Sequence, residues 1–582
     1  MADHRPIRIA NCSGFYGDRL SAAREMVEGG PIDVLTGDWL AELTMLILWK
    51  AKARNADAGY AATFLTQMEQ VLGTCVDRNI KVVTNAGGLN PAGCADRVRE
   101  IADRLGISVN VAHIEGDDLM ERIDGLRPHL DHLDSGEPLT VQPVSANAYL
   151  GGWGIVRALR EGADVVVAPR VTDAAVVVGP AAWWWNWSST DWDRLAGAVA
   201  AGHVIECGPQ ATGGNFSFFT ELGDQPGRAP SRPLGFPIAE VAEDGSSVIT
   251  KHPGTGGRVT IETVTAQLLY EIGPPAYPNP DVIARFDTCV LSDDGADRVR
   301  ISGTRGEPAP PTTKVALNYE GGYRNRMTFV LTGLDQAAKA AWVEHALTAA
   351  LGGNDELAAR GVTLDVRFAP VDPSGIDQER SSGFLHVTAK GPDDRSVGRA
   401  FSSAAVELAL ASIPGFFATS APGPASAYGV YWPALVPADE VDQRVVLDDG
   451  RRIAIDPAPT TSPPSEPITP PTIDAAPADL PAGEPLGRWF GARSGDKGGN
   501  ANVGIWARDD AGYAWLAEHL TVDRAREMLP ETGDRPIHRY ELPNLRALNF
   551  VLVGYLGEGV ASSTAFDPQA KGLGEYLRSR PV

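Results

Sequence analysis

Several ionisable side chains in this sequence have the types and spacing that acid–base chemistry requires. His203 and Glu206 stand three residues apart, a spacing that puts two side chains on one face of a helix but on opposite faces of a strand. A histidine beside a carboxylate can be a general base with an orienting partner, or simply an ion pair. Asp173 and Asp38 each follow a predicted strand. We take Asp38, Asp173, His203 and Glu206 as candidate catalytic residues.

Two glycine pairs are candidates for binding an anion. Gly87 and Gly88 follow Asn85 and precede a predicted helix that begins near Pro91, and Gly213-Gly214 lies in a second glycine-rich loop. Paired glycines before a helix can present backbone N–H groups to an anion or a developing oxyanion. The alternative is a tight turn without a ligand. We assign Asn85 and all four glycines to substrate binding.

The densest polar loop lies near the C-terminus, at residues 493–502. It contains Arg493 and Lys497 among several glycines, a composition that can form a phosphate-binding nest. The alternative is a flexible hairpin loop. We assign Arg493 and Lys497 to substrate binding and expect their domain to be able to close over a site in the first domain.

Cofactor motifs are weak or missing. The carboxylates Asp38, Asp173 and Glu206, with His203, could together hold a divalent metal, but their spacing matches no recognised metal motif. Gly14 and Gly17 lack the spacing of a dinucleotide-binding loop, and the sequence contains no phosphate-loop lysine motif. We therefore expect no cofactor.

These residues require a scaffold that brings them together. Over the first 180 residues, short β-branched runs alternate with amphipathic helices, which predicts a parallel sheet flanked by helices. Ligands of such sheets bind beyond the carboxyl ends of the strands. Polar residues stand at five predicted strand ends, and we expect one site there, which includes Asn11, Thr36-Gly37-Asp38, Asn85, Glu115 and the segment 170–173 with Arg170.

The remaining sequence divides into three parts. From residue 286 to 455, strands at 314–319 and 326–331 flank Gly321-Gly322 as a predicted hairpin, and helices and further strands follow, which together indicate an α+β domain. Residues 456–485 are rich in proline and predict an extended linker. Residues 486–582 regain strands and a helix, so we expect a small tethered α+β domain after an α/β domain at 1–285.

Composition limits the partners. The chain has 582 residues and a formal net charge of −23, which argues against nucleic acid or an anionic membrane as the main partner. Its five cysteines are widely spaced and indicate free thiols. The N-terminal residues lack the apolar stretch of a signal peptide, and the most apolar segment, 39–49, is too short to cross a membrane. We expect a cytoplasmic protein that acts on a small molecule.

Four segments carry a family resemblance. They are Asn11–Arg19, Thr36–Glu42, Thr84–Pro91 and Gly202–Gly208. Over about residues 5–455 the chain resembles the acyclic terpene utilisation family AtuA, and the tail with the loop at 493–502 resembles the small ferredoxin-like domain of many members. The resemblance implies a role in the breakdown of citronellol- and geraniol-type acids, alongside enzymes of CoA esters. It implies no catalytic residues.

Together, the residues and the resemblance lead to three hypotheses. The first is a lyase, either a hydratase or a C–C lyase, that acts on a branched acyl-CoA or carboxylic acid through an enolate-like state. In it Asp173 or His203 is the base, Glu206 orients His203, glycine amides hold the oxyanion, and Lys497 or Arg493 meets a phosphate or carboxylate. The second is a non-catalytic subunit that presents the ligand to a partner enzyme, and the third is a metal-dependent hydrolase. The tryptophan run at 183–187 and the chain length are compatible with a homo-oligomer.

Overall fold

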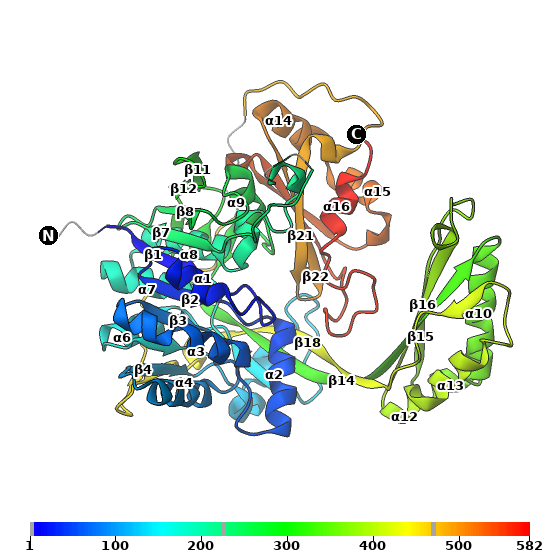
Figure 1. Ribbon diagram of the computed structural model, residues 1–582, viewed down its shortest axis with the longest axis horizontal. Helices are drawn as coiled ribbons and strands as arrows, with labels where there is room; N and C mark the ends of the chain where they lie inside the picture. Colours follow the sequence, from blue (N-terminus) through cyan, green and yellow to red (C-terminus); the bar gives the residue numbers. More distant parts are fainter. Residues whose placement is uncertain (1–4, 224, 226, 467–472) are drawn as a thin grey trace. The chain divides into compact units, whose positions relative to one another are not determined.

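The chain forms two compact units in the computed structural model, which describes residues 5–223, 225, 227–466 and 473–582 (Figure 1). The first unit comprises Met1–Asn318, Tyr431–Val560 and Asp567–Val582, and the second comprises Tyr319–Val430 and Ala561–Phe566. Our expectations for residues 1–4 and for 467–472 of the linker lie outside the described residues. The described parts of the predicted linker contain no helix and only isolated bridges, at Thr461 and Pro485.

The centre of the first unit is an eleven-stranded sheet in the order β11-β12-β8-β7-β1-β2-β3-β6-β4-β19-β20. Its five central strands are parallel: β1 (Ile7–Asn11), β2 (Val34–Gly37), β3 (Lys81–Thr84), β6 (Val165–Val167) and β4 (Val111–Glu115). The flanking strands are antiparallel: β7 (Pro237–Val241), β8 (Ser247–Lys251), β11 (Val290–Asp293), β12 (Val299–Ser302), β19 (Arg444–Val446) and β20 (Arg452–Ala454).

The predicted α/β class is confirmed, but the prediction of a parallel sheet is right only for these central strands. The outer strands come in pairs joined by short connections, such as the one from Val241 to Ser247. A connection of that length allows only antiparallel pairing, whereas parallel neighbours need a long crossover.

Successive side chains of the central strands point to opposite faces of the sheet and so belong to two hydrophobic cores. Ile9 and Val34 face one core, and Ala10 and Leu35 face the other. The first core is covered by α6 (Trp153–Arg160), α7 (Ala175–Trp185) and α8 (Trp192–Ile205). The second is covered by α1 (Ala22–Glu28), α3 (Ala62–Asp77) and α4 (Pro91–Leu105), so flanking helices are confirmed for the central strands.

Smaller elements complete the core of the first unit. They are α2 (Glu42–Arg54), α5 (Ile123–Leu126), α9 (Ile261–Leu268), β5 (Ser145–Ala148) and the three-stranded sheet of β9 (Ala276–Pro278), β10 (Ile283–Arg285) and β13 (Arg305–Glu307). The tryptophan run ends α7, and the indole N–H groups of Trp185 and Trp187 donate to the carbonyls of Val241 and Glu243. These indoles are therefore used in packing within the unit.

The C-terminal part of the chain forms a four-stranded antiparallel sheet in the order β21-β22-β24-β23. Its elements are β21 (Phe490–Lys497), β22 (Asn500–Ala507), α14 (Asp510–His519), α15 (Val522–Met528), β23 (Ile537–Leu542), β24 (Ala547–Leu552) and α16 (Leu573–Arg578). Buried amides dock this domain on the rest of the first unit: Asn502 donates to the carbonyl of Leu269, and Asn549 donates to that of Gly273. The domain that we expected on a tether is therefore packed against the larger core.

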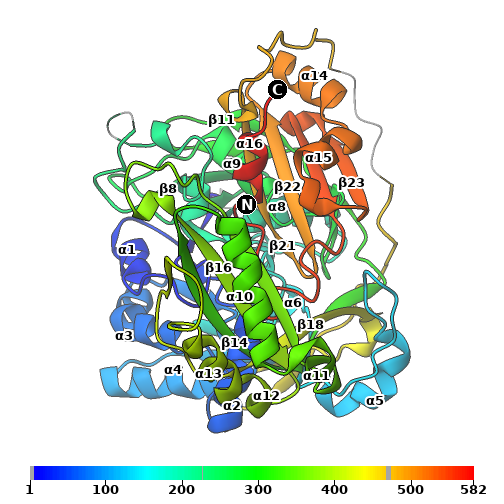
Figure 2. The ribbon, with the colours of Figure 1, turned by 90° about the vertical axis from the view of Figure 1, so that its right-hand side faces the viewer.

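The second unit contains β14 (Thr312–Thr332), which starts in the first unit, with β15 (Thr363–Ala369), β16 (Ser382–Gly391), β17 (Phe416–Ala418) and β18 (Ser426–Pro437). Its helices are α10 (Gln336–Ala350), α11 (Gly353–Ala359), α12 (Asp394–Val397) and α13 (Arg399–Glu407), which lie on one side of the strands (Figures 1 and 2).

The predicted hairpin at Gly321-Gly322 is wrong, because β14 runs through both glycines as one strand of 21 residues. The glycines serve close packing instead of a turn. A Cβ on Gly321 would lie 2.4 Å from the ring of Tyr428, and one on Gly322 would lie 2.5 Å from the carbonyl oxygen of Gly391. Gly322 also has a φ of +119°, which other residues rarely adopt.

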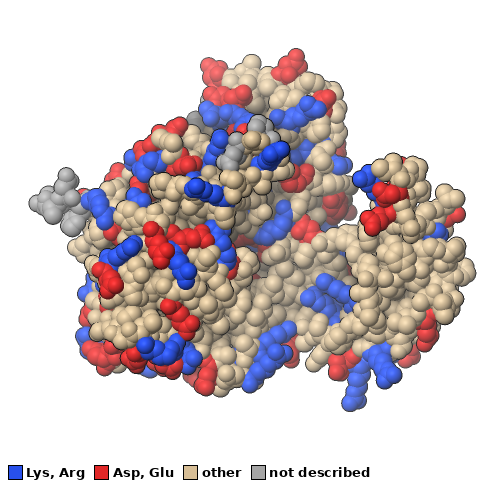
Figure 3. Space-filling view, in the orientation of Figure 1, with Lys and Arg blue, Asp and Glu red and all other residues tan. Residues whose placement is uncertain are grey.

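Two further properties bear on the sequence predictions. Cys12, Cys75, Cys94, Cys207 and Cys289 are free thiols. None of the helices in the described ranges is both long enough and apolar enough to span a membrane. The face drawn in Figure 3 carries lysine and arginine interspersed with aspartate and glutamate.

Candidate functional site

Polar side chains that follow three neighbouring strands meet at one edge of the central sheet. Asp38 follows β2, and its carboxylate accepts a hydrogen bond from the amide of Asn85, which follows β3. Asn11 ends β1 and donates from Nδ2 to the backbone carbonyl of Glu206 at 3.2 Å. Asn11, Asp38 and Asn85 are all buried. The parallel strands thus bring these side chains together, as their order predicts.

Arg170 and Asp173, which follow β6, join the same edge. Arg170 donates from Nη1 to the carbonyl of Leu40 and from Nη2 to the hydroxyl of Tyr149, both at 2.9 Å. Its Nη1 lies 3.4 Å from Oδ1 of Asp173. Glu115, at the end of β4, is not brought in: it pairs with His113 and Arg452 instead.

His203 and Glu206 lie at the end of α8, so they share one helical face. His203 is in the last turn, Glu206 is the residue that caps the helix, and Nδ1 of His203 lies 3.5 Å from Oε1 of Glu206. The imidazole packs against the rings of Tyr277 and Phe286, with centroids 5.2 and 5.3 Å away. The helical alternative of the sequence prediction is therefore correct.

The C-terminal domain contributes two cations to this region. Lys497, the last residue of β21, donates from Nζ to the backbone carbonyl of Glu271 at 2.7 Å and lies 5.1 Å from the ring centre of Tyr277. Arg493 donates to the side chain of Gln210 and lies 4.2 Å from the ring centre of Tyr270. The predicted loop residues thus reach the larger domain, where Lys497 adjoins the same aromatic ring as His203.

Burial dominates the protonation of the carboxyl groups. Burial, reinforced by the charge of Asp38, raises the pKa of Asp173 to about 7, although Arg170 opposes this shift. Burial also raises the pKa of Glu206 well above its usual range, and the charges of Asp173 and Asp38 add to the effect. Burial thus favours the protonated form of Glu206, and Asp173 is poised between its two forms near neutral pH.

The basic groups are shifted in the opposite direction. Burial and the neighbouring charge of Lys314 lower the pKa of Lys497 to about 8. Burial, with the charge of Lys497, lowers the pKa of His203 to about 3. The imidazole is therefore neutral at physiological pH. The site combines an acid and an amine that both titrate near neutrality, as proton-transfer chemistry requires.

Sequence reasoning missed several members of this cluster. Nζ of Lys314, in β14, lies 3.6 Å from Oε1 of Glu42 and 5.1 Å from the ring centre of Tyr149. Although burial alone would raise it, Lys314 and Arg170 lower the pKa of Glu42 to about 2. The available signal for Lys314 was its place at the start of the predicted strand 314–319, which is mostly apolar. Glu42 lies in a segment that carries the family resemblance, but its spacing did not mark it as a site residue.

The backbone N–H groups of the four glycines all donate hydrogen bonds within the chain. The N–H of Gly87 donates to the carbonyl of Ala168, and the N–H of Gly88 donates to that of Asn85. The amides of Gly213 and Gly214 donate in the same way to the carbonyls of Gln210 and Pro209. Three of these bonds close local turns, and the bond of Gly87 joins the segments that follow β3 and β6. The oxyanion-binding role remains a prediction that these hydrogen bonds do not favour.

The four candidate catalytic residues do not make a metal centre. Within the ranges that the structure describes, no three His, Cys, Asp or Glu side chains are grouped so that they could hold a metal ion. Asp38 is bonded to Asn85, and Asp173 is paired with Arg170.

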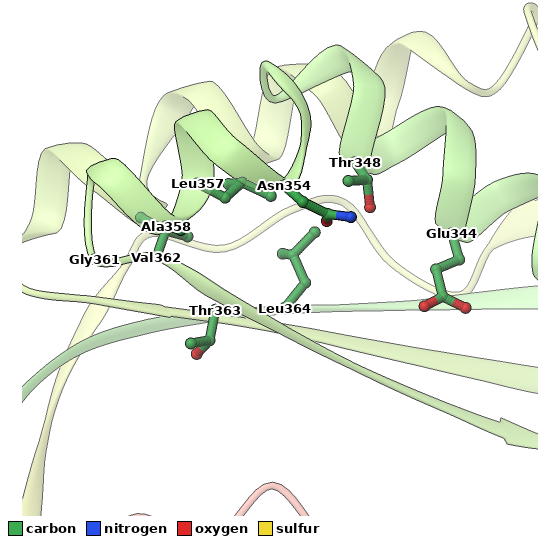
Figure 4. Close-up of a pocket in the computed structure, with 9 residues that line it drawn as sticks. All are labelled: Glu344, Thr348, Asn354, Leu357, Ala358, Gly361, Val362, Thr363 and Leu364. Atoms are coloured by element: carbon green, nitrogen blue, oxygen red, sulfur yellow. The ribbon is translucent and has the colours of Figure 1, made fainter.

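Two surface pockets lie apart from these residues. One, of about 410 Å³, is in the second unit, where side chains from α10, α11 and the start of β15 surround it (Figure 4). The other, of about 260 Å³, is in the first unit beside α2 and is lined by Trp49, Lys52, Leu89 and Asn147, among others. Neither pocket is lined by the candidate catalytic residues.

The comparisons with known proteins identify the family. Residues 7–447 match the family described as "Acyclic terpene utilisation family protein AtuA", and residues 485–582 match the "AtuA ferredoxin-like domain". No curated protein and no solved structure matches the chain. The first match covers more than half of the sequence, and the second coincides with the four-stranded antiparallel sheet. The chain therefore belongs to the acyclic terpene utilisation family AtuA and ends in the ferredoxin-like domain of that family.

Proposed function

We propose that this protein is a lyase, either a hydratase or a C–C lyase, that uses the buried cluster around Asp173 to move a proton at the α-carbon of a branched acyl-CoA or carboxylic acid. Membership of the family indicates a role in acyclic terpene utilisation. The observation that carries the proposal is the environment of Asp173, a buried carboxyl group beside Arg170 with a pKa of about 7.

Asp173 is the base in this proposal. Both reactions pass through an enolate-like state, so a base must remove or return a proton next to a carbonyl group. A base works best when its pKa is near the working pH, which favours Asp173 over His203, whose pKa is about 3. Oδ1 of Asp173 is buried and lies 3.4 Å from Nη1 of Arg170, but it accepts no hydrogen bond from a described residue, so it can take the substrate proton.

Glu206 and His203 support the reaction beside Asp173. Burial favours the protonated form of Glu206, and a protonated carboxyl group can donate a hydrogen bond to a carbonyl oxygen that becomes negative. Oε2 of Glu206 is buried, and no described residue bonds to it. Nδ1 of His203 lies 3.5 Å from the other oxygen of this carboxyl group without a hydrogen bond to it, and in this proposal His203 is a positioning residue.

Lys497 and Arg170 supply the positive charge. The enolate and the carboxylate or phosphate of the substrate are anionic, and buried cations stabilise such charge strongly. Lys497 and Arg170 lie close enough to the carboxylates for their charges to act on the pKa of Asp173 and Glu206. Arg493 stays the second candidate for a substrate phosphate. These side chains replace the glycine amides as the main oxyanion donors.

The test is incubation of the protein in heavy water with branched unsaturated and hydroxylated acyl-CoAs, followed by mass spectrometry. Hydration, cleavage and α-proton exchange are then read from one experiment. The Asp173→Asn variant is compared with Asp164→Asn, because Asp164 stands at the opposite end of β6 and pairs with Lys81. We expect exchange or turnover in the wild type and in Asp164→Asn, and a loss of roughly 100-fold or more in Asp173→Asn.

Two results would contradict the proposal. If Asp173→Asn retains full activity, Asp173 is not the base. If the wild type binds the thioesters and neither exchanges nor converts them, the protein is the non-catalytic subunit of the second hypothesis, and a partner enzyme should then co-purify with it.

A further inference from the structure

The sheet of the second unit has one covered face and one open face. Met327 and Phe329 of β14 and Leu385 and Val387 of β16 point into the core that α10 and α13 cover. The alternating residues of the same strands point to the other face. That open face includes Arg324, Arg326 and Thr328 of β14 and Phe384, His386, Thr388 and Lys390 of β16.

Positive charge is concentrated at one end of this open face. Arg324 is directly opposite Lys390 in the antiparallel pair, and Arg326 is opposite Thr388. Like charges directly opposite each other destabilise a sheet, and burial together with the charge of Arg326 lowers the pKa of Arg324. Such an arrangement is stabilised when a polyvalent anion binds.

A short segment of the second unit, Ala561–Phe566, lies on this face. Arg324 donates to the carbonyl of Ala561 at 2.8 Å, and Arg326 donates to that of Ser563 at 2.9 Å. These acceptors are neutral, and each described bond uses one of the five N–H donors of a guanidinium. Both arginines therefore keep donors for a charged ligand.

Aromatic rings occupy the next rows of the same face. The ring of His386 contacts Phe566 edge-on, with centroids 4.6 Å apart, and lies parallel to Phe384 at 6.3 Å. Phe384 and Phe566 are 41% and 58% exposed, so their rings are accessible. Burial and the charge of Arg326 lower the pKa of His386, so its ring is uncharged at neutral pH and can stack on a base.

We propose that this open face binds a mononucleotide, with its phosphate groups on Arg324, Arg326 and Lys390 and its base on the rings of Phe384, His386 and Phe566. Arg326 and His386 lie in neighbouring rows, about 7 Å apart along the strands. A ribose spans a similar distance between a base and its 5′-phosphate. Stacking surfaces and cations in this order are what nucleotide recognition needs. This inference does not depend on the proposed function.

The net charge of −23 favours a single nucleotide over a long nucleic acid. A polynucleotide needs a basic surface along many phosphates, whereas β14 and β16 offer three cations at one end of this face. Strand β15 adds Arg367 to the same face, where it forms an ion pair with Asp365. A nucleotide of two or three phosphates is matched by this number of charges.

The experiment is calorimetric titration of the full chain with ADP, pyrophosphate and adenosine. Arg326→Ala and Phe566→Ala change exposed side chains, so the fold is retained, which thermal unfolding verifies. The matched controls are Arg399→Ala and Trp342→Ala, which remove an exposed arginine and an exposed aromatic ring from helices α13 and α10.

We expect each of the two test variants to weaken ADP binding about tenfold, and the controls to leave it unchanged. Pyrophosphate should be affected only by Arg326→Ala, and adenosine only by Phe566→Ala. The proposal is overturned if the wild type shows no saturable binding of ADP up to about 1 mM, or if Arg326→Ala and Phe566→Ala bind ADP as the controls do. It is also overturned if a single-stranded oligonucleotide binds more tightly than ADP, because the face would then belong to a nucleic-acid interface.

Discussion

Lys497 in the C-terminal domain donates a 2.7 Å hydrogen bond to the backbone carbonyl of Glu271, which follows α9 in the larger domain of the first unit. The two residues are far apart in the sequence. Their bond nevertheless holds the amine of Lys497, whose pKa is about 8, near the carboxyl groups of Asp173 and Glu206. The ferredoxin-like domain thus contributes a titratable group to the candidate site, and this has consequences that can be measured.

The rate should depend on pH as a bell-shaped curve. Catalysis requires deprotonated Asp173 and protonated Lys497, so kcat/KM should rise as pH increases through about 7 and fall as it passes about 8. The two apparent values belong to the coupled cluster as a whole. Lys497→Arg should remove the alkaline limb, because a guanidinium stays charged. Lys52→Arg is the control, because Lys52 also donates to a backbone carbonyl but lies outside the cluster, where its acceptor is Leu89. If the alkaline limb persists in Lys497→Arg, Lys497 is not the group that causes it.

Asp173→Asn should stabilise the fold more at high pH than at low pH. The folded-state pKa of Asp173, about 7, is above its unfolded value, so the folded state binds an extra proton between the two values, and stability due to this group falls as pH rises through that window. An amide removes this cost. Chemical denaturation should show a larger gain in the free energy of unfolding at about pH 8 than at about pH 5. An equal gain at both pH values would mean that the carboxyl group is not shifted.

Asn549→Ala should loosen the C-terminal domain. Its Nδ2 donates to the carbonyls of Ile272 and Gly273, and its Oδ1 accepts from Asn502. Removing this buried amide leaves those partners unsatisfied, at a cost of roughly 3 kcal/mol in the free energy of unfolding. Denaturant titration measures this loss of stability. The control is Asn354→Ala, which changes an exposed side chain and should cost less than about 0.5 kcal/mol. Similar midpoints for both variants would show that the docking does not depend on Asn549.

Gly322→Ala should destabilise the second unit by about 1–3 kcal/mol. The backbone of Gly322 has a φ of +119°, and an added Cβ would lie 2.5 Å from the carbonyl oxygen of Gly391. Gly423→Ala is the matched control in the same unit, because a Cβ there would meet no described atom within 4 Å. Thermal unfolding compares the two variants. If they unfold alike, neither the positive φ nor the close approach to Gly391 requires glycine at position 322.

The sequence by itself determined the central strands and the polar residues at their ends. Parallel strands joined by helices end at one edge, so Asn11, Asp38 and Asn85 had to meet once β1, β2 and β3 were adjacent. The spacing of His203 and Glu206 was equally local, because three residues on a helix place both on one face. These are short-range patterns, which a single sequence contains.

Only the tertiary structure decided the other half of the site and the form of β14. Three members of the site come from separate segments: Lys314 lies in β14, Tyr149 follows β5, and Lys497 ends β21. No local periodicity in the sequence links these residues to Asp173. The glycine pair at 321 and 322 has the composition of a turn, yet the neighbouring Tyr428 and Gly391 require its lack of side chains within a continuous strand. Long-range packing brings these groups together and excludes water from them, and that burial shifts the pKa of Asp173 and of Lys497 toward neutrality.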